Sequence, residues 1–400
     1  MLTPRGRLAL VFGAGVYVAA WAFGSRPLYP VAVGFLLAVL LAAANVHVTS
    51  RPMRYLRFGG AHEHLEGDDV VVDVELELSA PLGVATVTVF ERIARLGEHR
   101  ITLTKHGHIL RGRLALDRLR RGRYALEEAV AVVEDPFGLE RAAVALPAQH
   151  ALLVLPRIVD IETPFSESGP RAHEGRKMLM RRPTGFDVHS VREYEEGESL
   201  RKVHWKSTAR RGQLMVKELQ DEPRDEVAIV LDARAETPVP AFDAAVRAAG
   251  SLLKAQVWRD RRAVLVITSL HEEVQRVQSY AGDWRSALES LAAAEPNGRL
   301  PLAAVLAEDG GAASRAHELA LVTARLEPNL VDRLVHRALA QRKVSVVYVD
   351  APTFTGARPS REPGLLRLQA SGVPVAVVRD GDDLAEVLSA RETTVEAARG

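Results

Sequence analysis

The 400-residue chain contains no cysteine. Disulfide bonds, thiol nucleophiles and cysteine-ligated zinc sites are therefore excluded. The formal net charge is only +1, so no strong overall field attracts a polyanion. We accordingly expect no nucleic-acid partner.

Two sequence motifs of common enzyme classes are also missing. There is no Gly-x-Ser-x-Gly nucleophile elbow and no Gly-x-x-x-x-Gly-Lys-Ser/Thr phosphate loop. His106-Gly107-His108 could form a metal site, but a hairpin tip with solvent-facing histidines explains this pair better. We expect no catalytic residue, metal or cofactor, and hence a protein that is not an enzyme.

What the chain does have is a pair of long apolar runs. Residues 8–24 and 28–46 carry no charge and are separated only by Ser25-Arg26-Pro27. Each run approaches the ~20 apolar residues that a membrane-spanning helix needs. Because a backbone in lipid must satisfy its own hydrogen bonds, the short turn predicts a two-helix transmembrane hairpin over residues 1–50.

The arginines that flank this hairpin predict its orientation. Most of them lie outside the turn, at positions Arg5, Arg7, Arg51, Arg54 and Arg57. The positive-inside rule then places both ends in the cytoplasm, which predicts a multi-pass protein of the bacterial inner membrane with its soluble domains facing the cytoplasm. The alternative is a cleaved signal peptide ending near Ala20-Trp21-Ala22. Residues 28–46 would then remain as a single anchor with the same orientation.

Alternating apolar and charged residues over 69–78 have the period of a half-buried strand. Similar runs follow at 85–92, 101–104, 109–116, 124–133 and 142–146. Short strands at this spacing, punctuated by glycine and proline, predict a β-sandwich over residues 51–160. Within it, residues 135–139 read Asp-Pro-Phe-Gly-Leu, which predicts a turn whose Phe137 packs into the core.

From residue 226 the pattern changes to continuous apolar runs that alternate with helical segments. Strands are predicted at 227–231, 263–268, 319–323, 344–349 and 373–378, and helices at 241–258, 284–293, 330–341, 364–370 and 383–390. Such alternation implies a parallel sheet covered on both faces. The prediction for residues 225–400 is a doubly wound α/β domain.

Residues 161–224 connect these two domains and contain the most distinctive segment, 185–222. Its candidate interaction residues are Gly185, Arg192, Tyr194, Gly197, Glu198, Arg201, His204, Trp205, Lys206 and Arg210. A helix is predicted over 200–209 with Ser199 as its N-cap. Two interpretations stay open: a structural clasp of ion pairs that joins the domains, or a docking surface or anion pocket formed by the basic residues. The interleaved glutamates argue against nucleic-acid binding.

On these residues, together with the run at 135–139, the chain resembles the bacterial membrane proteins of the family called domain of unknown function 58. The family pattern usually has Gly-Asp where this chain has Gly197-Glu198, which keeps the charge. The resemblance implies a membrane hairpin, a β-sandwich and a domain similar to the von Willebrand factor A fold. It also implies association with a MoxR-type AAA+ ATPase, and it supplies no agreed biochemical activity.

A von Willebrand factor A domain binds a divalent cation with Asp-x-Ser-x-Ser after its first strand. Here that position reads Asp232-Ala233-Arg234-Ala235-Glu236. Both serines are missing, and Arg234 places a positive charge where the cation should lie. We therefore expect no metal site, and we expect Asp232 to pair with Arg234 or to cap a helix.

Together these features predict a membrane-anchored, non-enzymatic adaptor or assembly factor that acts with a MoxR-type ATPase. Its expected partners are the lipid bilayer, that ATPase and other membrane proteins. One alternative is a metal-dependent, ligand-binding A domain. The other is an uncharacterised enzyme with its site in residues 185–222, where His204 or Glu198 would move a proton.

Overall fold

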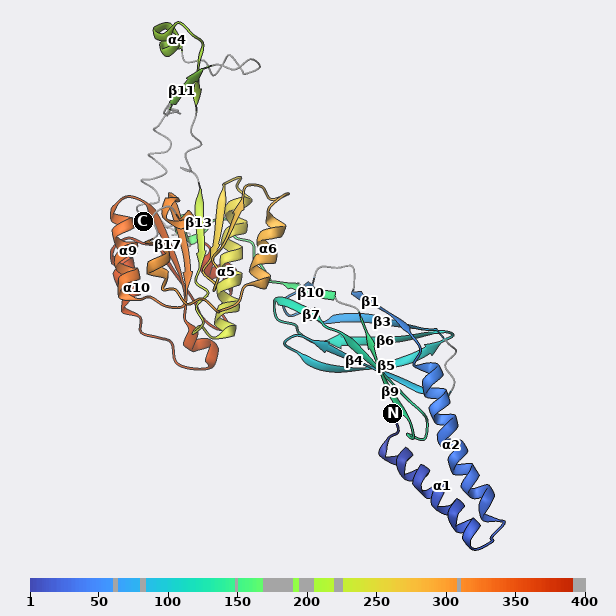
Figure 1. Ribbon diagram of the computed structural model, residues 1–400. Helices are drawn as coiled ribbons and strands as arrows, with labels where there is room; N and C mark the ends of the chain where they lie inside the picture. The colour runs from blue at the N-terminus through green and yellow to red at the C-terminus, as the bar shows by residue number, and fades with distance from the viewer. Residues whose placement is uncertain are drawn as a thin grey trace, which may run out of the picture. The chain divides into compact units, whose positions relative to one another are not determined.

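The computed structural model describes residues 1–59, 64–79, 84–147, 150–167, 190–193, 205–218, 226–307 and 311–390. The chain divides into two compact units, Met1–Leu155 and Pro156–Gly400, which are described separately (Figure 1). Several candidate residues lie outside the described residues, namely Gly185, Tyr194, Gly197, Glu198, Arg201 and His204, as does the expected N-cap Ser199.

The first unit opens with two helices, α1 (Pro4–Ala22) and α2 (Leu28–Thr49), which pack against each other as a hairpin (Figure 1). Phe12 meets Phe35 edge-on with ring centroids 5.1 Å apart, and Tyr17 meets Tyr29 in the same way at 5.4 Å. By length and composition, α2 is the one helix among the described residues that can cross a bilayer. Helix α1 is less apolar because Arg5 and Arg7 lie in its first turn. The structure thus has one candidate span where the sequence predicted two.

The described strands of this unit form a single curled, ten-stranded sheet with the path β1-β3-β6-β5-β4-β7-β10-β2, to which β8 and β9 are added beside β4. The strands are β1 (Met53–Gly59), β2 (His64–Leu65), β3 (Val70–Leu78), β4 (Thr86–Ile93), β5 (Gly97–His106), β6 (Ile109–Leu116), β7 (Gly122–Leu126), β8 (Ala129–Glu134), β9 (Arg141–Leu146) and β10 (His150–Leu155). Strand β5 pairs with β4 up to Thr102 and with β6 from Leu103 onward. This change of partner makes the sheet continuous around one buried core.

The sequence missed β1 because arginines interrupt its alternation. The side chain of Arg57 is nevertheless buried, and one of its guanidinium nitrogens lies 2.6 Å from a carboxylate oxygen of the equally buried Glu91. The hydroxyl of Tyr55 donates to the other Glu91 oxygen at 2.8 Å. An internal ion pair therefore allows a strand with two arginines to belong to the core. The single strand predicted at 124–133 is two strands, β7 and β8.

The expectation for Phe137 was wrong, because its side chain is 73% exposed at the β8–β9 turn. The buried carboxylate of Asp135 holds the turn instead, accepting from the backbone N–H of Phe137 at 2.9 Å and of Glu140 at 2.6 Å. An aspartate that bonds the backbone ahead of it closes a turn without any help from an aromatic anchor.

The start of α1 is fastened to the same turn. The backbone N–H of Thr3 donates to the carbonyl of Leu139 at 3.1 Å, and the Thr3 hydroxyl caps the helix by accepting from Gly6 at 3.1 Å. The backbone approach is so close that a Cβ on Gly6 would lie 2.0 Å from the Leu139 carbonyl oxygen.

Replacing Gly6 with alanine is therefore expected to push α1 away from the β8–β9 turn and to cost about 1–3 kcal/mol of unfolding free energy. The matched control is Gly15→Ala on the same helix, where an added Cβ meets no atom within 4 Å. That change should be neutral or stabilising by up to ~1 kcal/mol. Thermal unfolding of the purified proteins measures both, and equal melting temperatures would disprove the close approach.

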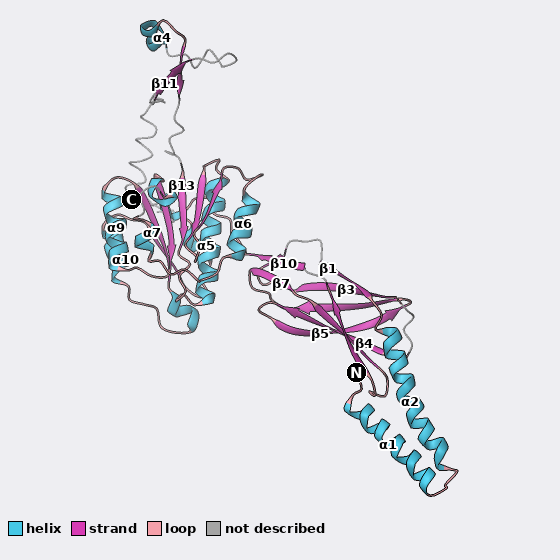
Figure 2. Ribbon diagram, in the orientation of Figure 1, coloured by secondary structure: helices cyan, strands magenta, loops and turns pink. Residues whose placement is uncertain are grey.

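The second unit is an α/β fold built on a six-stranded sheet with the strand order β15-β14-β13-β16-β17-β18 (Figure 2). Its strands are β13 (Val227–Leu231), β14 (Ala263–Ile267), β15 (Glu273–Val277), β16 (Glu318–Thr323), β17 (Lys343–Val349) and β18 (Val375–Val378). All pairings are parallel except that of β15, an antiparallel edge strand that the sequence missed. The predicted parallel sheet is confirmed.

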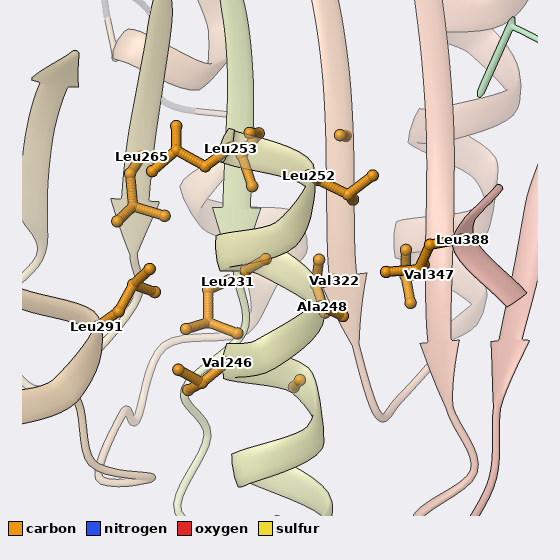
Figure 3. Packing of buried hydrophobic residues seen from close by; sticks show 14 of the residues in the cluster. Leu231, Val246, Ala248, Leu252, Leu253, Leu265, Leu291, Val322, Val347 and Leu388 are labelled. Carbon is orange, nitrogen blue, oxygen red and sulfur yellow. The ribbon is translucent and has the colours of Figure 1, made fainter. Parts of the chain in front are cut away.

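Helices cover both faces of this sheet, which gives it two apolar cores. The first core joins α5 (Val239–Val257), α6 (Trp284–Ala293) and α11 (Leu384–Leu388) to one face. In Figure 3, Ala248 and Leu252 of α5 lie over the strands of Leu231, Val322 and Val347. The second core joins α7 (Leu302–Val305), α8 (Ala312–Arg315), α9 (Pro328–Leu339) and α10 (Pro363–Ala370) to the other face.

Two short strands of the distinctive segment, β11 (Ser190–Glu193) and β12 (Met215–Glu218), pair antiparallel, with Arg192 opposite Val216. Between them in the chain lies α4 (Trp205–Arg211). This helix overlaps the predicted one at 200–209, whose first five residues lie outside the described part of the chain.

Candidate functional site

The parallel sheet brings polar side chains from distant parts of the chain to one edge. Asp232 follows β13, Thr268 follows β14, Thr323 ends β16 and Asp350 follows β17. All four are buried. Because the carboxyl ends of parallel strands are where α/β proteins form their sites, this edge is the first place to look for function.

Asp232, Arg234 and Glu327 form a chain of alternating charges there. One Asp232 oxygen accepts from the Thr323 hydroxyl at 2.7 Å, and the other lies 3.7 Å from Nε of Arg234. Nη1 of Arg234 donates to Glu327, which directly precedes α9, at 2.6 Å. The predicted pairing of Asp232 with Arg234 is confirmed, whereas Thr323 and Glu327 were not foreseen.

Backbone contacts fix Arg234 in this position. The N–H of Ala233 donates to the Thr268 hydroxyl at 3.1 Å, and the N–H of Gly298 donates to the Ala233 carbonyl at 2.7 Å. A Cβ on Gly298 would lie 2.1 Å from the Thr268 carbonyl oxygen, so only glycine permits this approach. The segment after β13 is thus held rigidly, with the guanidinium between the two carboxylates.

Burial is the largest influence on the pKa of Asp232, which it raises, while the Thr323 hydrogen bond and Arg234 pull it back down. For Arg234, burial alone would lower the pKa, but the hydrogen bond that it donates to Glu327 and the charge of Asp232 raise the pKa overall. The hydrogen bond with Arg234 lowers the pKa of Glu327. Arg234 is therefore a permanent cation, held between the carboxylates of Asp232 and Glu327.

Two further observations bear on the chemistry of this edge. Within the described residues, no group of three or more His, Asp or Glu side chains is placed to hold a metal ion. Asp350 has a structural role, because both of its carboxylate oxygens accept from the backbone N–H of Ser360, at 3.1 and 3.2 Å. The expectation that the whole chain has no metal site stays a prediction.

The distinctive segment contributes a different kind of surface. Trp205 is 67% exposed, and Lys206 and Arg210 are exposed on the same short helix α4. The helix is tied to β12 by the N–H of Met215, which donates to the Thr208 hydroxyl at 3.0 Å. The structure thus brings three of the candidate interaction residues together. Arg192 lies in β11, and the other six candidates lie outside the described residues.

Removing the guanidinium should leave Asp232 buried without its cation. We expect Arg234→Met to cost about 3–5 kcal/mol of unfolding free energy. The control is Arg325→Met, because the Arg325 side chain is 50% exposed and lies 3.6 Å from an exposed carboxylate of Glu236. Exposed pairs contribute ~1 kcal/mol or less. Urea unfolding followed by tryptophan fluorescence measures both, and equal losses would contradict a buried charge network.

The two carboxylates should also respond to pH in opposite ways. The raised pKa of Asp232 means that its contribution to stability is full below the pKa of the unfolded chain and is lost as pH rises through the folded value. The lowered pKa of Glu327 gives a contribution that is present at neutral pH and is lost as pH falls.

Unfolding free energies of the wild type, Asp232→Asn and Glu327→Gln should be compared from about pH 3 to pH 7. The wild-type advantage over Asp232→Asn should shrink as pH rises, and the advantage over Glu327→Gln should grow. Slopes of the same sign would refute the assigned environments.

Comparison with known proteins adds a family and no function. No curated protein matches the chain. The structural matches include a cycloalternan-forming enzyme from Listeria monocytogenes, with a TM-score of 0.18 and 13% identity, covering 24% of this chain and 9% of that one. Another is the Pseudomonas fluorescens alkylpurine DNA glycosylase AlkC, with a TM-score of 0.16 and 15% identity, covering 31% and 39% of the two chains. Likenesses this slight carry no argument.

The family model is informative because it covers most of the residues that carry the resemblance. It matches residues 190–352, from β11 through the end of β17, and it includes α4 as well as Asp232, Arg234 and Glu327. Over these residues the chain matches the family described as "Protein of unknown function DUF58", and the match supports placing it in that family.

Proposed function

We propose that this protein is a membrane-anchored, non-enzymatic adaptor or assembly factor that binds partners through the exposed face of α4. The observation that carries the proposal is the exposure of Trp205 beside Lys206 and Arg210 within the family-matched segment. Tryptophan and arginine are the residue types most enriched among the energetically dominant contacts of protein interfaces. The family resemblance suggests a MoxR-type AAA+ ATPase as the partner.

The anchor of this adaptor is the α1–α2 hairpin. Leu8 and Val11 of α1 and Leu40 of α2 are large apolar side chains that are exposed in the structure. Patches of this kind are rare on proteins that live in water, and a bilayer removes them from water. Aromatic rings of α1 pack edge-on against rings of α2, so both helices lie in the same environment. We therefore propose that α1 enters the bilayer together with α2, although α2 alone meets the criterion for a span. The flanking arginines favour the cytoplasmic side for both chain ends.

The same proposal assigns each soluble unit a type. The curled sheet of Met1–Leu155 is proposed to close as a β-sandwich, supported by the large apolar core that its strands share. The α/β unit is proposed to be a von Willebrand factor A-like domain in which Arg234 replaces the divalent cation. In support, Arg234 follows the first parallel strand and lies between two carboxylates at the carboxyl edge.

An adaptor explains the charged edge better than an enzyme does. Asp232 and Arg234 interact with each other, with Thr323 and with Glu327, and both are buried. Groups held in such mutual contacts are poorly placed to exchange protons with a substrate, because the transfer would leave an unpaired charge in the interior. The edge is therefore proposed to stabilise the unit, while α4 makes the contacts with partners.

The binding surface is tested by affinity purification from detergent-solubilised membranes. Trp205→Ala should reduce recovery of a MoxR-type ATPase by about tenfold or more, as expected for truncation of an interface anchor. The matched control is Trp258→Ala, because Trp258 is 65% exposed and lies outside the distinctive segment. Recovery should be unchanged in that control.

Equal recovery with both tryptophan variants would remove α4 as the binding surface and leave the segment as a structural clasp. A second variant, Arg210→Ala, separates the contribution of charge from that of the ring. The difference in ATPase recovery between the wild type and Arg210→Ala should become smaller as salt is added, because salt screens exposed charges.

A further inference from the structure

Two large apolar side chains are exposed at the end of the first unit where α1 begins and α2 ends. Phe137 is 73% exposed and Val84 is 70% exposed. We call this pair the apolar rim. Neither side chain belongs to an apolar core of the unit. Each projects from a turn or loop beside a helix end, where it could contact the same surroundings as the helices.

The contacts of the neighbouring residues place the rim beside the helices. The Phe137 turn is fastened to the start of α1, since the N–H of Thr3 donates to the Leu139 carbonyl at 3.1 Å. Val84 directly precedes Ala85, which packs with Val46 in the last turn of α2. One rim residue therefore flanks the beginning of α1 and the other flanks the end of α2. Figure 1 shows both helix ends at the same end of the sheet.

The depth of the rim follows from helix geometry. The uncharged run of α1 begins at Leu8, five residues after Thr3, which is ~7.5 Å at ~1.5 Å per residue. A hydrocarbon core of ~30 Å within a bilayer of ~40–45 Å leaves a headgroup layer of about 5–8 Å on each side. If residues from Leu8 onward lie in hydrocarbon, the ring of Phe137, at the level of Thr3, lies in the headgroup layer.

The charges around the rim suit the same surroundings. Arg5, Arg7 and Arg51 are exposed at the same helix ends. Basic residues near the membrane surface are attracted by anionic headgroups, and aromatic or aliphatic side chains beside them enter the boundary between headgroups and acyl chains. Apolar side chains interspersed with arginine at the end of an apolar hairpin thus match a lipid surface.

We propose that Val84 and Phe137 insert into the headgroup–acyl boundary of the bilayer and seat the β-sheet unit on the membrane surface. The inference rests on the proposed anchoring of α1 and α2 and goes beyond it, since a hairpin alone would tether the unit without fixing its orientation. The lipid contacts of Val84 and Phe137, together with the two helices, would fix the orientation of the sheet relative to the membrane.

The absence of cysteine makes this directly measurable, because any introduced cysteine is unique. The rim variants are Phe137→Cys and Val84→Cys. The control is Leu96→Cys, which replaces an exposed leucine in the turn after β4, so that the whole eight-residue strand separates it from Val84. Leu40→Cys in α2 reports on the anchor. Each is labelled with the fluorophore NBD and reconstituted into vesicles of phosphatidylethanolamine and phosphatidylglycerol.

Quenching by nitroxide lipids is compared with quenching by iodide in the water. The rim labels should be quenched several-fold more strongly by a nitroxide near the headgroup than the Leu96 label, and should be shielded from iodide. Rim labels as open to iodide as the Leu96 label, with the Leu40 label still buried in lipid, would overturn the seating and leave the anchor intact. A Leu40 label open to iodide would overturn both the anchor and the seating.

Discussion

A buried guanidinium held between two carboxylates is the constraint on which this account of the protein depends. Arg234 lies between Asp232 and Glu327 at the carboxyl edge of the parallel sheet, where an α/β protein usually keeps its reactive groups. A side-chain cation cannot exchange ligands as a bound metal can, because its backbone is fixed by Ala233, Gly298 and Thr268. We propose that these contacts make the edge part of the structural framework of the unit.

Once that edge is closed, the exposed parts of the chain become the candidates for function. They are the apolar faces of α1 and α2, the rim at their ends and the short helix α4 with its exposed tryptophan. Each exposes apolar or aromatic surface to water, at a cost that a bilayer or a protein partner removes. In the proposed adaptor, these exposed surfaces bind lipid or protein partners, while the buried charges of Asp232 and Arg234 pair with each other.

The sequence predicted the elements whose signals are local. The parallel strands were found because they are continuous apolar runs, and Val227–Leu231 was placed to the residue. Strand β15 was missed because an edge strand of alternating polar residues has no such run. Strand β1 was missed because the partner that permits Arg57 to be buried, Glu91, lies on another strand. Phe137 was misjudged because the sequence cannot show that Asp135 alone closes the turn.

The same limit applies to the site. Asp232 and Arg234 are near neighbours in the chain, so their pairing was predictable. Thr323 and Glu327 come 91 and 93 residues after the groups they bond, and only the register of β16 beside β13 brings them together. The central claim is tested most directly by titrating the purified protein with magnesium and manganese in a calorimeter. The account predicts no saturable heat for either ion, whereas saturable binding that Asp232→Asn abolishes would contradict it.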